Sequence, residues 1–304
     1  MAKSEVSGII PPLVTPMTSD LDFDEEAFLR LIDHVIGGGV NGLFIIGTNG
    51  ESASLSNDIR RKVIDTAVKG NANRVPLFVN ISSSSYLETL QLADYAAGSG
   101  ADFVVLSPPY YFLMDQSELS RYYERIASRT ALPLFLYNAP HYTKNEIAHE
   151  TVAKLSLHEN ILGIKDSSGT IDYVHRLLDQ RRDEAFRVLI GPEMILGECV
   201  LLGCNGGVNG GGNLFPKLYV KMYRAAINRN LDEIRKWQSI INNVHKYIYE
   251  VSGSPMAIIL GLKYALSTKG ICSGNMAMPV YDELTDQQKK IIDGFLKDSD
   301  QYDI

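Results

Sequence analysis

The chain has 304 residues, of which 45% are hydrophobic and 21% charged, so it can bury the core of one large domain or two ordinary ones. Its formal net charge of −7 at pH 7 argues against nucleic-acid binding, which needs a basic face. Residues 1–6 lack the apolar centre of a signal peptide, and no apolar stretch approaches the ~18 residues of a membrane span. We therefore expect a soluble cytoplasmic protein without nucleic-acid or membrane partners.

Eight short apolar runs recur along the first two thirds of the chain and predict strands. They span residues 8–14, 42–46, 76–80, 102–106, 132–137, 161–165, 187–191 and 206–208. Their uninterrupted apolar character is typical of parallel strands that are buried on both faces. Segments with helical spacing separate them, and Asp24 and Ser56 are the expected N-caps of the first two helices. Apolar stripes at helical spacing are Phe28/Leu31/Ile32/Val35, Ile59/Val63/Ala67, Leu87/Leu90/Ala97 and Leu119/Tyr122/Ile126.

This alternation predicts a (β/α)₈ barrel, a fold of typically ~250 residues. The competing architecture is a doubly wound open sheet, which usually carries a glycine-rich phosphate loop after its first strand. Here the first strand leads into 11-PPLVTP-16, with no such loop, and the barrel is favoured. We expect the barrel to occupy residues 1–228.

Residues 229–304 are predicted to form a helical extension packed on the barrel. Helical spacing continues over 218–227, 231–250, 255–266 and 285–296, with no further strand pattern. Thr285 and Gln288 form an expected capping box for the last helix.

Polar residues follow several of the predicted strands, at the end of a barrel where active sites lie. Strand two ends in 47-GTNGES-52, a turn whose backbone N–H groups suit a small anion. Strand five ends in 137-YNAP-140, and strand six ends in Lys165. A lysine at the end of a core strand is desolvated, which lowers its pKa and leaves a nucleophilic amine suited to forming a Schiff base with a ketone. Each signal has an ordinary alternative: an ion pair from Lys165 to Asp166 or Glu193, a packed Tyr137, or a plain glycine turn.

Metal-ion chemistry is not indicated. The cysteines at positions 199, 204 and 272 lack metal-ligand spacing, and the six histidines form no cluster. We expect buried free thiols and no metal site. The glycine stretch 206–212 is too glycine-dense for a helix and suits close approach of backbone to a crowded site.

Taken together, the motifs resemble one family, the pyruvate-dependent class I aldolases that include dihydrodipicolinate synthase and N-acetylneuraminate lyase. The resemblance rests on 47-GTNGE-51, 137-YNAP-140, 163-GIKD-166 and the glycine stretch 206–213. It implies that Lys165 forms the imine with pyruvate or another 2-oxo acid, and that Tyr137 moves protons through Thr48 and Tyr111. In the family the tyrosine matching Tyr111 comes from a neighbouring subunit, and the resemblance implies a homotetramer, a dimer of dimers, or at least a dimer. The resemblance further implies that Thr48 and Asn49 hold the carboxylate, that the backbones of Gly191 and Val208 line the imine, and that no cofactor is required.

The sequence departs from the family pattern at the end that meets the aldehyde. Dihydrodipicolinate synthases carry an arginine where this chain has Tyr142, and a second threonine where it has Asn49. N-acetylneuraminate lyases carry a serine where this chain has Gly210. A tyrosine offers one hydroxyl where arginine grips a carboxylate with two N–H groups. We therefore favour a lyase for another 2-oxo acid, such as a 2-keto-3-deoxy sugar acid, with the tail of the substrate met by His141, Tyr142, Glu193 and Asn209.

Two other functions stay open at this level. The first is 4-hydroxy-tetrahydrodipicolinate (dihydrodipicolinate) synthase, which condenses pyruvate with aspartate semialdehyde on the same catalytic residues. The second is a non-catalytic regulatory protein that binds a 2-oxo acid, against which the presence of Lys165 and Tyr137 argues.

Overall fold

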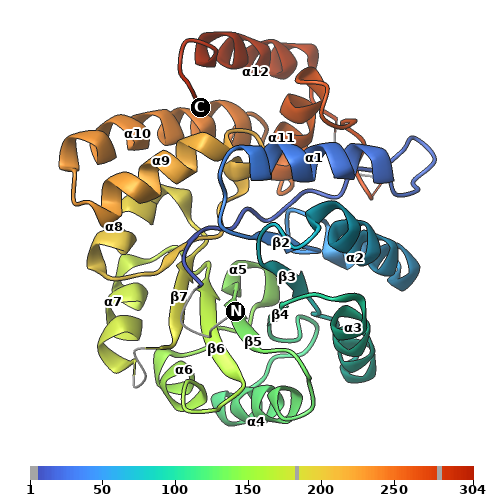
Figure 1. Cartoon of the computed structure of the whole chain (residues 1–304), viewed down its shortest axis with the longest axis vertical. Coiled ribbons are helices and arrows are strands. Elements are labelled where there is room, and N and C mark those ends of the chain that lie inside the picture. Colours follow the sequence, from blue (N-terminus) through green and yellow to red (C-terminus); the bar gives the residue numbers. More distant parts are fainter. Residues whose placement is uncertain (1–5, 182–184, 279–282) are drawn as a thin grey trace.

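The apolar runs form eight parallel strands in the computed structural model, which describes residues 6–181, 185–278 and 283–304 (Figure 1). The strands pair in the order β1-β8-β7-β6-β5-β4-β3-β2. Beyond the end of β1, Pro12 bridges to Phe44 of β2, and the Leu13 N–H donates to the Phe44 carbonyl at 2.8 Å, which closes the ring. The predicted (β/α)₈ barrel is therefore confirmed. Its strands are β1 (Gly8–Ile9), β2 (Leu43–Ile45), β3 (Leu77–Asn80), β4 (Phe103–Leu106), β5 (Leu134–Asn138), β6 (Ile161–Asp166), β7 (Arg187–Ile190) and β8 (Gly206–Gly207).

Strand β1 is much shorter than the seven residues predicted for it. Pro11 and Pro12 lack the backbone N–H that a continuous ladder needs, so regular pairing stops at Ile9. Beside it, Gly206 approaches Gly8 so closely that a Cβ at position 206 would lie 2.0 Å from the Gly8 carbonyl oxygen. The glycine stretch is thus used for close packing of backbones, as its composition indicates.

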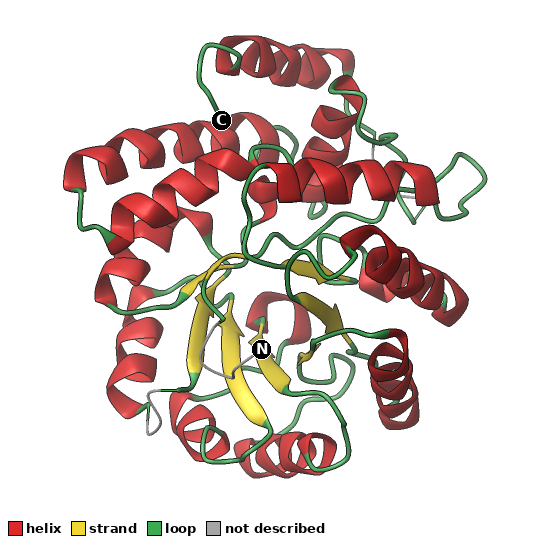
Figure 2. Cartoon of the chain, viewed as in Figure 1, coloured by secondary structure: helices red, strands yellow, loops and turns green. Residues whose placement is uncertain are grey.

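Helices surround the strands on the outside of the barrel (Figure 2). The side chain of Asp24 caps the first helix and that of Ser56 caps the second, as predicted. The outer ring consists of α1 (Glu25–Gly37), α2 (Asn57–Asn71), α3 (Tyr86–Ser99), α4 (Gln116–Ala127), α6 (His149–Leu155), α7 (Ile171–Gln180), α8 (Leu196–Leu202) and α9 (Pro216–Ile227). The single turn α5 (Pro140–Thr143) follows β5 directly and lies within the ring of strands in Figure 1.

The C-terminal segment adds α10 (Leu231–Val244), α11 (Ala257–Thr268) and α12 (Asp286–Ser299), which stack at one side of the barrel in Figure 1. The capping box of Thr285 and Gln288 is confirmed. The single helix predicted over residues 231–250 is wrong in its last part, because α10 ends at Val244 and continues as one turn of π-helix (His245–Tyr249). The glycine stretch, predicted to be non-helical, contains a short 3₁₀ turn (Gly210–Asn213).

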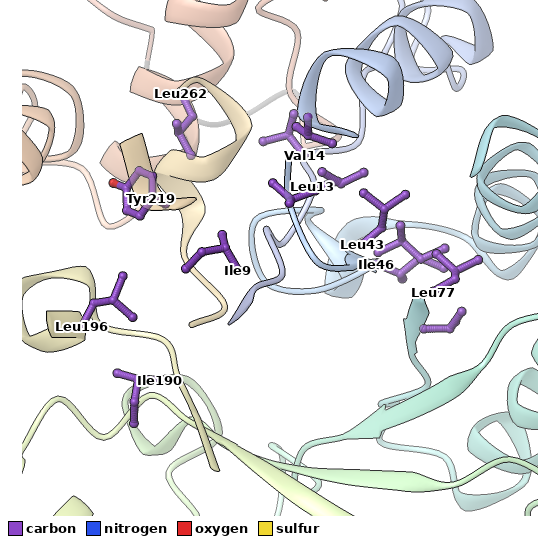
Figure 3. Close-up of a cluster of buried hydrophobic side chains, with 14 of the residues drawn as sticks. Ile9, Leu13, Val14, Leu43, Ile46, Leu77, Ile190, Leu196, Tyr219 and Leu262 are labelled. Carbon is purple, nitrogen blue, oxygen red and sulfur yellow. The ribbon is translucent and has the colours of Figure 1, made fainter. Parts of the chain in front are cut away.

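One hydrophobic core runs from the barrel into the C-terminal helices. Ile9 of β1 and Ile190 of β7 belong to the same buried cluster as Tyr219 of α9 and Leu262 of α11 (Figure 3). The same core thus includes side chains from both segments, and the division at residue 228 stays a prediction. A second, smaller cluster fills the inside of the barrel, where the rings of Phe78, Phe103 and Phe135 pack together.

The described residues contain no helix long and apolar enough to cross a membrane. Residues 1–5, where the sequence predicts no apolar leader, lie outside the described part. Cys199, Cys204 and Cys272 are buried free thiols, as expected from their spacing.

Candidate active site

Lys165 stands next to last in β6 and borders both a small apolar cavity inside the barrel and the larger cavity at its mouth. The residue is 5% exposed, and its Nζ lies 4.7 Å from the centroid of the Phe44 ring and 4.1 Å from that of Tyr137. Among the described residues no carboxylate forms an ion pair with it. Burial without a counter-charge lowers the pKa of Lys165 to about 7, so a large share of the side chain is free amine near neutral pH.

The two carboxylates that the sequence offered as partners of Lys165 are bound elsewhere. Asp166 is fully buried and accepts hydrogen bonds from Asn138 Nδ2 at 2.8 Å and from Ser168 Oγ at 2.8 Å. Glu193 accepts hydrogen bonds from the hydroxyls of Tyr219 and Tyr249. The alternative that Lys165 forms an ion pair with Asp166 or Glu193 is therefore wrong, and its amine is available for reaction.

Tyr137 is the register partner of Lys165 on the neighbouring strand β5. Its hydroxyl lies 3.0 Å from Thr48 Oγ1. Burial raises the pKa of Tyr137, and hydrogen bonds from Thr48 and Ser167 oppose that rise. The phenol is therefore protonated at neutral pH and joined to a hydroxyl chain, an arrangement suited to proton transfer beside an amine.

A buried bridge one residue beyond this pair fixes the two strands. Asn138 and Asp166 are also register partners, joined by the 2.8 Å hydrogen bond described above. Asn138 Oδ1 accepts from the Ile147 N–H at 3.1 Å, so both ends of its amide are used. The bridge holds the ends of β5 and β6 together and so sets the position of Tyr137 relative to Lys165.

The turn at residues 47–52 presents Thr48 and Asn49 to the same mouth. Thr15 Oγ1 donates to the Gly50 carbonyl at 2.8 Å and anchors the turn to the chain that follows β1. Glu51 has a left-handed backbone (φ 55°), and its carboxylate accepts from Lys263 Nζ and from the Ala277 N–H at 2.7 Å. This turn is thus fastened to the C-terminal extension by a fully buried ion pair.

These side chains surround a cavity of about 310 Å³ at the carboxyl ends of the strands. It brings together most of the residues predicted from the sequence: Thr48, Asn49, Tyr137, His141, Tyr142, Lys165, Gly191, Glu193 and Val208. An adjoining cavity of about 250 Å³ shares Thr48, Tyr137 and Tyr142 with it and is also lined by Arg60. Thr48 and Tyr137 therefore belong to the walls of both cavities.

Asn209 and Glu193 differ from the expectation that both are open to a substrate tail. Asn209 is fully buried and outside the cavity, because its Nδ2 donates to the carbonyls of Ile190 (3.1 Å) and Gly191 (3.0 Å). Glu193 borders the cavity, but its Oε1 accepts from the Gly211 N–H and from Tyr249 OH, both at 2.8 Å, and its Oε2 accepts from Tyr219 OH. Burial raises the pKa of Glu193. Both side chains position backbone around the site.

Tyr111 is not part of the cavity in one chain. It is 77% exposed in the loop after β4, beside Phe112 (74%) and Leu113 (76%). Its ring packs edge-on against Phe112, with centroids 4.9 Å apart. A relay from Tyr137 to Tyr111 therefore requires a second copy of the chain and stays a prediction.

Sequence reasoning missed several residues that border the cavity: Ser167, Met194, His245, Tyr249 and Ile258. Ser167 follows β6 two residues after Lys165, so its place after a strand could have indicated it. The others depend on how the C-terminal helices and the 3₁₀ turn after β7 (Glu193–Ile195) pack against the barrel. The described residues hold no group of three or more side chains suited to a metal ion.

Comparison with known proteins places this barrel in a family. Residues 5–298 match the model of the Dihydrodipicolinate synthetase family. The chain belongs to this family. It is 32% identical to a 4-hydroxy-tetrahydrodipicolinate synthase of Phenylobacterium zucineum over 90% of each chain. It is also 30% identical to an uncharacterized DapA-like lyase of Halobacterium salinarum, over 96% of this chain and 93% of the relative.

Solved structures agree with this assignment. A dihydrodipicolinate synthase from Bacteroides thetaiotaomicron superposes with a TM-score of 0.92 at 42% identity, covering 97% of this chain and 99% of the other. YagE of E. coli K12, solved in complex with pyruvate, gives 0.90 at 28% identity, covering 97% and 98%. The chain is therefore a lyase, a pyruvate-dependent aldolase of the dihydrodipicolinate synthetase family.

Proposed function

We propose that Lys165 forms a Schiff base with the C2 keto group of pyruvate or of a larger 2-oxo acid. The observation that carries the proposal is a buried amine without an ion pair, 4.1 Å from the ring of Tyr137. The amine attacks the ketone to give a carbinolamine, which loses water to give the protonated imine. The imine accepts the electron pair when the C3–C4 bond breaks, and the C4 hydroxyl loses its proton to leave an aldehyde. The resulting enamine takes a proton at C3 to give the imine of pyruvate, and water hydrolyses that imine to release pyruvate and the free amine. In the other direction, the enamine attacks an aldehyde.

Tyr137 would supply and remove protons in these steps. Its hydroxyl would protonate the carbinolamine oxygen that leaves as water, and Thr48 would return the proton through their 3.0 Å hydrogen bond. Thr48 and Asn49 would hold the carboxylate of the substrate, and the backbones of Gly191 and Val208 would lie against the imine. No metal or organic cofactor is needed for this chemistry.

The aldehyde end favours a hydroxylated substrate, such as a 2-keto-3-deoxy sugar acid. Tyr142 stands where dihydrodipicolinate synthases carry arginine, and it is half exposed at the mouth. Lys144, the nearest lysine in sequence, turns back so that its Nζ donates to the His141 carbonyl at 2.9 Å. Lys165 is thus the only lysine, and no arginine is present, among the described residues that line this cavity.

The second candidate is the condensation of pyruvate with aspartate semialdehyde. Several relatives at about 30% identity are named 4-hydroxy-tetrahydrodipicolinate synthase. The specific observation in its favour is Arg60, whose guanidinium lines the adjoining cavity and has a buried Nε without a hydrogen-bond partner. A non-catalytic regulatory protein is the third reading, and the intact pair of Lys165 and Tyr137 argues against it.

The decisive test is to incubate the protein with pyruvate, reduce it with borohydride and weigh it. We expect one pyruvyl adduct per chain that is absent from Lys165→Ala. Without any adduct in the natural sequence, both enzyme readings fail. Comparison of kcat/KM for 2-keto-3-deoxy acids and for aspartate semialdehyde with pyruvate then separates the two enzyme hypotheses. A clear preference for the semialdehyde would make the dihydrodipicolinate synthase hypothesis the leading one.

We further propose a homotetramer, a dimer of dimers in which Tyr111 completes the proton relay of a neighbouring copy. Its support is the exposed apolar loop of Tyr111, Phe112 and Leu113, which a second copy would cover. Leu113→Asp should shift the mass measured by light scattering to a smaller species and lower kcat. A monomeric natural sequence with full activity would contradict the proposal. The three buried free thiols are consistent with a reducing compartment such as the cytoplasm.

A further inference from the structure

The C-terminal extension supplies one wall of the cavity that contains Lys165. His245 and Tyr249 of the π-helix and Ile258 of α11 line it, opposite residues that follow the barrel strands. The extension is therefore more than a cover for the barrel, because the shape and polarity of the cavity depend on it.

The π-helix fixes the direction of His245. The Glu250 N–H donates to the His245 carbonyl at 3.0 Å, five residues back, so this turn contains one residue more than an α-helical turn. Such turns are rare and occur frequently at functional sites. Tyr249 is tied to Glu193 by its 2.8 Å hydrogen bond, and the ring of His245 packs edge-on against Tyr249 with centroids 5.6 Å apart.

The contacts of the two histidines at the mouth indicate which ring nitrogens carry hydrogen. His245 Nδ1 lies 3.4 Å from Glu250 Oε1, and His141 Nε2 lies 3.2 Å from the Ser168 carbonyl. The Glu250 carboxylate and the Ser168 carbonyl can only accept, so each favours the tautomer with hydrogen on the ring nitrogen that faces it. In that tautomer of a neutral ring, the other nitrogen carries no hydrogen and is an acceptor. His245 Nε2 and His141 Nδ1 have no hydrogen-bond partner within the described ranges, and each has a lone pair to offer.

The barrel side of the mouth offers few other groups to a substrate tail. Glu193 is saturated by three donors, Asn209 is buried outside the cavity, and position 210 is a glycine. A Cβ at Gly210 would lie 2.5 Å from Asn49 Nδ2, so a side chain there would displace Asn49. The tail therefore meets His141, Tyr142 and His245.

We propose that His245, acting with His141, determines specificity by accepting hydrogen bonds from hydroxyl groups on the tail of the 2-oxo acid. The inference rests on the imine chemistry proposed above and adds the C-terminal extension as the element that selects the substrate. A hydroxylated tail has hydrogens for both lone pairs. A carboxylate tail has none and would face two acceptors, and a methyl tail would leave both without a partner.

Three 2-oxo acids that share the cleaved bond test this inference: 2-keto-3-deoxygluconate, 4-hydroxy-2-oxopentanoate with a methyl tail, and 4-hydroxy-2-oxoglutarate with a carboxylate tail. We expect the natural sequence to have the highest kcat/KM on the first. His245→Leu removes the acceptor and should lower the preference for the hydroxylated acid over the methyl one by about 10-fold or more. His245→Gln keeps an acceptor oxygen and should retain part of that preference.

Lys246→Ala is the matched control, because Lys246 is the next residue of the same π-helix and does not line the cavity. It should leave the preference unchanged, and circular dichroism of each variant checks the fold. An unchanged preference in both His245 variants would overturn the inference, as would a natural sequence that traps pyruvate yet does not favour the hydroxylated acid. Failure to trap pyruvate at all would instead refute the proposed imine chemistry, so the two failures are distinguishable.

Discussion

Tyr137 and Lys165 are register partners on β5 and β6, and the Lys165 Nζ lies 4.1 Å from the centroid of the Tyr137 ring. Parallel pairing brings both residues to the same level of the barrel, although 28 positions separate them in the chain. The hydrogen bond between Asn138 and Asp166, one residue further along both strands, holds this level. The pairing of the two strands therefore places the nucleophile, Lys165, next to the proton carrier, Tyr137.

The pH dependence of imine formation should report the lowered pKa of Lys165. Because the pKa is about 7, the reactive amine should increase as pH rises to about 7 and then level off. An ordinary lysine, with a pKa of ~10.4, would hold roughly 10³-fold less amine at pH 7. Stopped-flow measurement of pyruvate binding from pH 5.5 to 9 checks this. A rate that still increases tenfold per pH unit above pH 8 would show that burial does not lower the pKa of Lys165.

Replacing Tyr137 by phenylalanine should lower kcat by ~10²-fold or more while the fold is retained. The change removes the hydroxyl that bonds to Thr48 and leaves the packing of the ring in place. Steady-state kinetics with the preferred 2-oxo acid provide the measurement. Tyr173→Phe is a suitable control, since its buried hydroxyl donates to the Ile147 carbonyl and lines neither described cavity that contains Tyr137. Equal activity of Tyr137→Phe and the control would remove Tyr137 from the mechanism.

Lys263→Met should lower the free energy of unfolding by about 3–5 kcal/mol. Lys263 and Glu51 are fully buried against each other, and removing one partner leaves an unpaired charge in the core. Urea unfolding followed by the fluorescence of Trp237, the one tryptophan, gives the value.

Two further variants show whether the buried charge causes that loss. The double variant Lys263→Met with Glu51→Gln should lose less than the sum of the single changes, because no charge is stranded. Lys269→Met, at the end of the same helix, removes an exposed pair with Asp300 and should cost less than about 1 kcal/mol. Similar losses for Lys263→Met and Lys269→Met would contradict the role given to the buried pair.

Glu193 and Tyr249 should show energetic coupling in a double-mutant cycle. Glu193→Gln and Tyr249→Phe each weaken the 2.8 Å hydrogen bond that ties the loop after β7 to the π-helix. We expect a coupling free energy of roughly 1 kcal/mol or more from urea unfolding. Glu193→Gln with Tyr264→Phe should be additive, since Tyr264 bonds to Asp293 on α12 instead. Additivity in both cycles would mean that the bond does not hold the wall of the cavity.

Local signals in the sequence predicted much of the fold. The apolar runs identified all eight strands, because a strand that is buried on both faces appears in the sequence as a continuous apolar run. Asp24, Ser56 and Thr285 were recognised as caps because capping involves only the next three residues. The end of α10 was missed because a π-turn has no strong local signature and is stabilised by what it packs against.

In the candidate site, too, some residues could be predicted from local signals, whereas the state of others depends on distant parts of the chain. Lys165, Tyr137 and Thr48 were predicted because each lies at or just beyond the carboxyl end of a strand, and a parallel barrel gathers those ends. Glu193 and Asn209 share that position, yet Tyr219 and Tyr249 donate to the Glu193 carboxylate, and the carbonyls of Ile190 and Gly191 accept from Asn209 Nδ2. Residue type shows that a side chain is polar, but the partners that satisfy it come from distant parts of the chain.

The sequence by itself determined the barrel, the strand-end lysine and tyrosine, and the absence of an arginine at position 142. Each follows from residue type and short-range spacing. Only the tertiary structure decided that Lys165 lacks an ion pair, that Glu51 is fastened to Lys263, and that His245 of the extension lines the cavity. These features depend on which distant surfaces pack together, and burial then sets whether a charged group is paired, neutral or available for chemistry.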